Sequence, residues 1–113
     1  MDRERHRLID MVDALDQIDA LLSGQSREIL EEDRIARAAY ERFLEIISEA
    51  SRHLPETSRM LAPEIPWRRV GDLGNHLRHA YHKVDAEALW NLHALGELAA
   101  LRQAVRRLLE RLE

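Results

Sequence analysis

The 113-residue sequence lacks cysteine and has little aromatic character, with two tryptophans, two tyrosines and one phenylalanine. Without cysteine, the chain forms no disulfide and offers no thiolate for catalysis or metal binding. Its longest apolar run, Leu98 to Leu101, is far shorter than the roughly 20 residues that cross a bilayer, which excludes a membrane-spanning helix. The first residues also lack the apolar segment of a signal peptide. We therefore expect a single domain, residues 1–113, in the cytoplasm.

Negative charge is in slight excess, because 21 acidic residues outnumber 17 lysines and arginines and give a net charge of −4. The charges are distributed unevenly. Residues 2–33 contain ten acidic and four basic residues, whereas residues 66–83 contain four basic residues, one acid and three of the six histidines. Since the local distribution of charge matters more for binding than its sum, the second segment is the better candidate for contact with nucleic acid.

Charged residues make up 34% of the chain and apolar residues 45%, in a mixture of leucine, alanine, arginine and glutamate that favours helices. Apolar spacings of three and four predict one helix over about residues 3–22 and a second that ends before Pro55. The first stripe is Leu8, Met11 or Val12, Leu15, Ile18 and Leu22, and the second is Ile35, Ala39, Phe43, Ile46, Ala50 and Leu54. Three prolines between Pro55 and Pro66 predict a loop.

A third helix is predicted from Pro66 onward, because proline suits the first turn of a helix. Its apolar seam is Val70, Leu73, Leu77, Ala80 and Val84. A rotation of about 100° per residue places a polar set on the opposite side, namely Gly71, Gly74, Asn75, Arg78, His79 and His82. Each glycine costs a helix roughly 1 kcal/mol relative to alanine, so we expect a partner helix or a phosphate to approach the backbone there.

The last part of the chain predicts a fourth helix. Asp85 is placed to cap it, and Gly96 predicts a break or kink within it. The seam that follows is Leu98, Leu101, Val105, Leu108 and Leu112. The expected fold is therefore all-α, an up-and-down bundle of four long helices with the last one split or kinked at Gly96.

The polar side of the third helix has three interpretations, of which two involve chemistry. Imidazole and guanidinium together suit phosphodiester cleavage, because a neutral histidine accepts a proton near pH 7 and an arginine binds phosphate oxygens. A solvated helix face without chemistry is the simplest alternative. The third is a metal site, but His76 and His82 lie about 120° apart around the helix, which leaves at most two histidines to share an ion with Asp72 or another residue.

Residues 65–90, IPWRRVGDLGNHLRHAYHKVDAEALW, resemble the HEPN superfamily, and specifically the HepT-like toxin ribonucleases found with MntA-type nucleotidyltransferase antitoxins. The matching features are a Pro-Trp pair, an asparagine, a His-x-Tyr motif, a Val-Asp pair and a later tryptophan. In this chain they are Pro66-Trp67, Asn75, His79, Tyr81, Val84-Asp85 and Trp90. Residues 34–56, which include Arg42 and the pair Glu49-Ala50, are similar to the second helix of that family.

The resemblance implies an all-helical homodimer that is a metal-independent endoribonuclease, needs no cofactor and cleaves cellular RNA. It also implies the toxin of a type VII-like toxin–antitoxin system, whose partner is an MntA-like nucleotidyltransferase antitoxin. By this resemblance His79 is the catalytic histidine, Asn75 is a motif polar residue, and Tyr81 is the tyrosine that the antitoxin modifies with AMP. We add Arg42, Glu49 and His82 as supporting polar residues.

The arginine that defines the family motif falls at position 74, where this chain has glycine. Helical side chains lean toward the N-terminus, so Arg78, one turn later, is predicted to fill the space beside Gly74 and to replace that arginine. A pair with similar spacing, Arg69 and His76, is a weaker alternative because it abandons the Pro-Trp and tyrosine registers. The alternative function is a catalytically inactive HEPN module that binds the nucleotidyltransferase partner.

Other residues have mainly structural interpretations. Trp67, Trp90, Tyr40 and Phe43 are expected to bury their rings. The acidic stripe Asp10, Asp13, Asp16 and Asp19 is expected to be a solvated face, with contact to the antitoxin as the alternative. The arginines Arg102, Arg106, Arg107 and Arg111 flank the last seam, where cations favour the helix C-terminus, and they are a second candidate for phosphate contact.

Overall fold

The computed structural model describes residues 3–78 and 85–113 with their side chains, and the backbone of residues 79 and 80. The helices of this part of the chain are α1 (Arg3–Leu22), α2 (Glu28–Glu32), α3 (Arg34–Arg52), α4 (Glu56–Arg59), α5 (Trp67–Ala80), α6 (Ala86–Ala94) and α7 (Glu97–Glu110). None of these helices is long and apolar enough to span a membrane.

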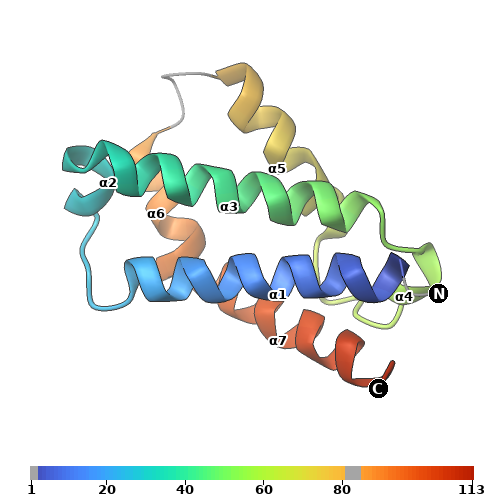
Figure 1. Ribbon diagram of the computed structural model, residues 1–113. Coiled ribbons are helices and arrows are strands. Elements are labelled where there is room, and N and C mark those ends of the chain that lie inside the picture. The colour runs from blue at the N-terminus through green and yellow to red at the C-terminus, as the bar shows by residue number, and fades with distance from the viewer. Residues whose placement is uncertain (1–2, 81–84) are drawn as a thin grey trace.

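The long helices pack side by side around one core (Figure 1). Helix α3 runs back along α1, and α5 packs on the other side of α3. Helix α7 packs against α1, while α6 connects α7 to the level of α2. The end of α5 near Ala80 projects beyond the rest of the bundle (Figure 1). The expectation of an all-α bundle with four principal helical segments is therefore confirmed, and the fourth segment is divided into α6 and α7.

The predicted helix limits have identifiable local causes. The Asp85 side chain caps α6 by accepting a 3.0 Å hydrogen bond from the amide of Glu87. Gly96 has a φ of 88°, in the left-handed region that glycine adopts without strain, and it separates α6 from α7 as predicted. Asp33, which the sequence analysis missed, caps α3 through hydrogen bonds from the amides of Ile35 and Ala36. The short helices α2 and α4 were also missed, and α4 lies within the predicted loop.

The buried face of α3 differs from the predicted stripe by about one residue over its first half. Ile35 is 83% exposed and Ala39 is only half-buried. The fully buried positions there are instead Ala36, Tyr40 and Leu44. The reason is that α3 has neighbours on several sides, so the large ring of Tyr40 and the small residues beside α5 decide its rotation. The later predicted positions, Ala50 and Leu54, are buried as expected.

The α7 arginines pair with carboxylates of this same chain. Arg102 lies 2.7 Å from an oxygen of Asp16, and Arg106 lies 3.2 Å from the same oxygen. This pairing corrects the expectation that the whole acidic stripe of α1 is a solvated face. The other pairs are Arg102 with Asp19, Arg107 with Glu64, and Arg111 with Glu4. The predicted seam Leu98, Leu101, Val105 and Leu108 is buried, but Leu112 lies beyond the end of α7 and is 37% exposed.

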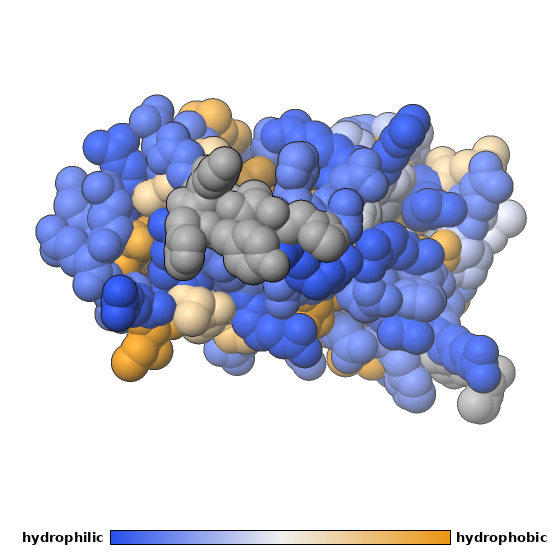
Figure 2. Space-filling view, turned by 90° about the horizontal axis from the view of Figure 1, so that it is seen from above, coloured by the Kyte–Doolittle hydropathy of each residue, from blue (hydrophilic) through white to orange (hydrophobic). Residues whose placement is uncertain are grey.

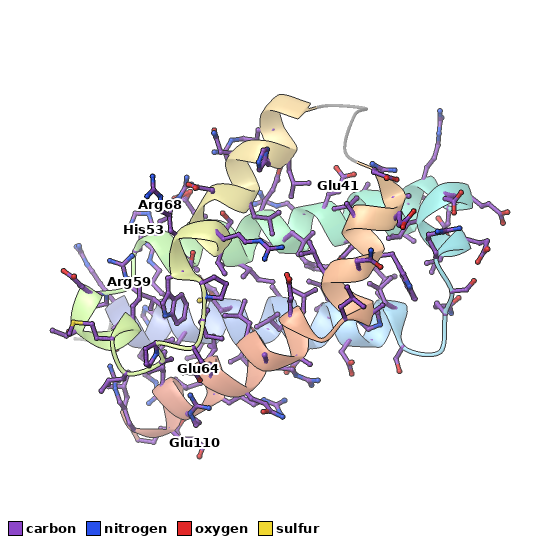
Figure 3. All side chains as sticks on the ribbon, turned by 180° about the vertical axis from the view of Figure 1, so that it is seen from behind. Glu41, His53, Arg59, Glu64, Arg68 and Glu110 are labelled. Carbon is purple, nitrogen blue, oxygen red and sulfur yellow. The ribbon has the colours of Figure 1, made fainter. Side chains whose placement is uncertain are left out.

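The start of α5 is fixed by its tryptophan. The Trp67 ring is half-buried, and its Nε1 donates hydrogen bonds of 3.1 and 3.0 Å to the carbonyl oxygens of Arg59 and Ala62. Figure 3 shows Arg59, His53 and Arg68 at this same end of the bundle, where α3 ends and α5 begins. These bonds join the start of α5 to the end of α4 and to the segment that follows it, and they fix where α5 begins beside α3.

Candidate functional site

A groove of about 230 Å³ lies between α1, α3 and α5. We call it the α1/α3/α5 groove. It brings together three of the predicted site residues, since Arg78 of α5 lines it with Arg42 and Glu49 of α3. The surface on the α5 side of the molecule is mostly hydrophilic (Figure 2). The other lining residues are Arg7 and Asp10 of α1 and Glu45, Ile46 and Ala50 of α3.

The guanidinium of Arg78 leans back over the preceding turn of α5. Its Nη1 lies 3.5 Å from the position that a Cβ atom at residue 74 would occupy. This is ordinary van der Waals contact. The guanidinium therefore lies beside position 74, where the resemblance to the HepT-like family places the motif arginine. The role of Arg78 in catalysis remains a prediction.

The two glycines of α5 do not face solvent, which corrects their predicted place on an open polar face. Both are buried against α3. The hydroxyl of Ser48, itself fully buried, donates a 2.8 Å hydrogen bond to the carbonyl oxygen of Gly71 and accepts a 2.9 Å hydrogen bond from the amide of Gly74. Of the two predicted reasons for the glycines, the close approach of a partner helix is the one that the fold uses.

Several of the charges in the groove already have partners. Arg42 lies 3.5 Å from Glu45, and Glu49 lies 2.9 Å from His53 and 2.5 Å from Arg52. Hydrogen bonds from His53 and Arg52 lower the pKa of Glu49, so this carboxylate stays charged. Arg42 and Glu49, which were predicted as supporting polar residues, are both exposed, and each pairs with a different residue. They line the groove as separate ion pairs.

Arg7 and Arg78 are different, because within the described part of the chain neither forms an ion pair. Arg7 is half-buried, and the sequence analysis did not single it out. One feature of the sequence could have identified Arg7. It directly precedes Leu8 of the buried stripe and therefore borders the face of α1 that packs on α3. Two guanidinium groups without carboxylate partners face one groove, and such groups bind phosphate oxygens.

The remaining predicted residues are only partly described. Asn75 is exposed on α5, one turn before Arg78. His79 belongs to the last turn of α5, but its side chain lies outside the described residues. Tyr81 and His82 also lie outside the described residues, as does Val84 of the predicted seam.

A second, larger groove of about 980 Å³ separates α5 from α6. The alternative pair Arg69 and His76 lines this groove, together with Asp72. Arg69 is bound to Glu97 at 3.2 Å, so it is less available to a substrate than Arg78. No three histidine, aspartate or glutamate side chains among the described residues are arranged to hold a metal ion. Apolar residues of both helices complete the lining, among them Leu73, Leu77, Leu89 and Leu92.

Comparison with known proteins gives consistent matches. The sequence model of the family described as ribonuclease HepT-like matches residues 11–108. A protein of Thermococcus cleftensis named "Probable ribonuclease HepT" is 39% identical over 87 residues, which cover 74% of this chain and 76% of that protein. A protein of Caldanaerobacter subterraneus subsp. tengcongensis named "Putative RNase" is 30% identical over 90 residues, or 80% of each chain. No solved structure matches the chain.

Proposed function

Because the chain belongs to the HepT-like ribonuclease family, we propose that it is a metal-independent endoribonuclease that cleaves cellular RNA in the cytoplasm. The observation that carries this proposal is the position of Arg78, whose guanidinium lies beside Gly74 and lines the α1/α3/α5 groove. His79 follows it directly, so one turn of α5 supplies both a phosphate-binding cation and a titratable base.

The proposed chemistry is acid–base cleavage of a phosphodiester. His79 accepts the proton of the hydroxyl whose oxygen attacks phosphorus, and the new P–O bond forms. The P–O bond to the leaving oxygen breaks as that oxygen takes up a proton from water. Arg78 binds the phosphate oxygens and stabilises the additional negative charge of the transition state. Asn75, on the same helix, is assigned to orientation of the substrate.

The groove suggests how an RNA strand reaches this turn. Arg7 and Arg42 line it with Arg78, so a strand lying along the groove meets one guanidinium from each of three helices. Phosphate contacts of this kind position RNA without reading its sequence. Their carboxylate neighbours Asp10, Glu45 and Glu49 limit the positive potential of the groove.

We further propose that two copies form a homodimer and that the chain is the toxin of a type VII-like toxin–antitoxin system. The groove between α5 and α6 supports dimerisation, because apolar residues such as Leu73, Leu77 and Leu92 line a large volume on an open face. The partner is then an MntA-like nucleotidyltransferase antitoxin that silences the toxin by AMPylation of Tyr81. Intact-mass analysis after incubation with ATP and the nucleotidyltransferase should show added AMP, and none in Tyr81→Phe.

One observation favours the alternative of an inactive module. The position of the family arginine is a glycine whose backbone is buried against Ser48, so no side chain at residue 74 reaches the groove in this chain. In that case the protein still folds and binds its nucleotidyltransferase partner but does not cleave RNA. The two functions differ in whether expression of the chain alone arrests growth.

RNA cleavage by purified variants tests the proposal. We expect His79→Ala and Arg78→Ala each to lower the cleavage rate by about 100-fold or more, because each removes a group that acts in the transition state. Arg68→Ala is the matched control, an exposed arginine of the same helix that lines the other groove, and it should retain the natural rate. Full activity of His79→Ala would refute the ribonuclease assignment. Absence of cleavage by the natural chain would favour the inactive module.

A further inference from the structure

Ser48 connects the middle of α3 to one turn of α5. It is completely buried, and its hydroxyl both donates to the carbonyl oxygen of Gly71 and accepts from the amide of Gly74. A serine within a helix usually bonds to a carbonyl of its own preceding turn. Ser48 uses its hydrogen-bonding capacity across the helix interface instead. The backbone of residues 71–74 is therefore fixed relative to α3.

The same contact leaves little room for a side chain at position 74. A Cβ atom there would lie 3.0 Å from Oγ and 3.2 Å from Cβ of Ser48. Because Ser48 is fully enclosed, it has no space into which to withdraw. An arginine at residue 74 is therefore crowded by a serine at residue 48, which would have to shift at its contact with α5, whereas a glycine at residue 48 would remove both of the closest atoms.

Arg78 uses the opening that this arrangement leaves. Its Nη1 lies 3.5 Å from the same Cβ position, on the side that lines the α1/α3/α5 groove. In an α-helix the amide of residue 78 bonds to the carbonyl of residue 74. Ser48, the backbone of Gly74 and the turn that carries Arg78 thus form one continuous set of contacts.

We propose that Ser48 is a positioning residue for Arg78, and that Ser48 and Gly74 together determine that the motif arginine acts from position 78 instead of position 74. This inference rests on the proposed ribonuclease function. Ser48 touches no substrate, and its role is to hold the turn of α5 from which Arg78 reaches the scissile phosphate. An error of about 1 Å in such a group is sufficient to lower a rate about 100-fold.

Relocation of the arginine tests the pairing. Arg78→Ala lowers the cleavage rate by about 100-fold or more. In the double variant Gly74→Arg/Arg78→Ala, Ser48 obstructs the new side chain, and we expect no recovery. In the triple variant Ser48→Gly/Gly74→Arg/Arg78→Ala the obstruction is gone, and we expect recovery of about tenfold or more, corresponding to about 1.4 kcal/mol of transition-state binding. Recovery in the double variant, or none in a folded triple variant, would overturn the proposal.

A single substitution tests the positioning role if the triple variant does not fold. Ser48→Ala keeps the packing but removes both buried hydrogen bonds, so we expect the thermal midpoint to fall by several degrees. Below that midpoint, where the variant is folded, kcat should fall about tenfold while KM changes little. Ser51→Ala is the matched control, a buried serine of the same helix whose hydroxyl bonds to the carbonyl oxygen of Ser48 instead of to α5. Equal losses of kcat in the two variants would refute a specific role for Ser48. Full activity of Arg78→Ala would instead remove Arg78 from the proposed function, and with it this inference.

Discussion

The hydroxyl of Tyr40 donates a 2.6 Å hydrogen bond to the carbonyl oxygen of Leu89, and this bond joins α3 to α6 inside the core. The Tyr40 side chain is fully buried. Burial raises the pKa of its hydroxyl well above the ordinary value, and the charge of Glu97 adds to the effect. The hydroxyl therefore stays protonated at neutral pH and donates this bond, which holds α6 against α3 at the end of the bundle near α2.

Removal of this donor gives the first prediction. Tyr40→Phe keeps the ring but leaves the Leu89 carbonyl without its partner from α3, and we expect a loss of about 1 kcal/mol in the free energy of unfolding. For a domain of this size, such a loss lowers the thermal midpoint by roughly 4–8 °C. Calorimetry of the two proteins measures it, and an unchanged midpoint would show that water replaces the tyrosine at no cost.

The two buried glycines of α5 should respond differently to alanine. At Gly71 the new methyl group meets Cγ of Arg52 at 3.1 Å, but this side chain is flexible and 39% exposed, so it can move away. Since alanine favours a helix by roughly 1 kcal/mol over glycine, Gly71→Ala should leave stability unchanged or raise it. Gly74→Ala forces a methyl group against the enclosed Ser48 and should destabilise by about 1–3 kcal/mol. Urea unfolding compares them, and equal effects would contradict the close contact at Ser48.

The role of the groove arginines can be separated from catalysis by measuring RNA binding in a His79→Ala background. If Arg7 and Arg42 each contact a phosphate, Arg7→Gln and Arg42→Gln should weaken binding to all sequences and lower the slope of log K against log salt by about 0.7–0.9 per contact. Arg34→Gln is the control, an exposed arginine at the start of α3 outside the groove lining. A slope reduced equally by all three substitutions would indicate a nonspecific charge effect.

Glu4 gives a pH-dependent prediction. Its partial burial raises the pKa, but hydrogen bonds from Ser58 and Arg111 and the charge of Arg111 lower it more, so the net pKa lies below the ordinary 4.5. A carboxylate with a lowered folded pKa stabilises the protein above its unfolded pKa, and that stabilisation is lost as the pH falls through the folded value. Glu4→Gln should therefore lower the thermal midpoint at pH 7, and the difference from the natural protein should shrink as the pH falls below 4.5. A difference that is constant across this range would refute the linkage.

The positions of the long helices along the chain were predicted better than the face that each helix buries. The stripe of α1 was correct, and that of α7 was correct as far as Leu108, because the apolar residues of each helix form a single buried face. Tyr40 and Ile35 of α3 show why the second stripe was wrong: α3 packs against both α1 and α5, so apolar residues occur around much of its circumference and their spacing does not define one face.

In the candidate site, the contact within one helix could be predicted from the sequence, whereas the contacts between helices could not. The lean of Arg78 over Gly74 follows from helix geometry alone, and so the sequence was sufficient to predict it. The contact of Ser48 with Gly74 spans 26 positions, and Arg7 reaches the groove from another helix. Such contacts depend on which helices are neighbours and on their register, neither of which is encoded in the spacing within a single helix.

The packing of the first long helix against the last has a consequence for the order of synthesis. Helix α1 has α3 and α7 as its principal neighbours, and the contact between Glu4 and Arg111 joins positions 107 residues apart. A chain that is still being translated therefore exposes one side of α1 until α7 has left the ribosome. During that interval α3 alone is available to cover the apolar face of α1, and Leu8, Met11 and Leu15 of that face stay partly open to chaperones.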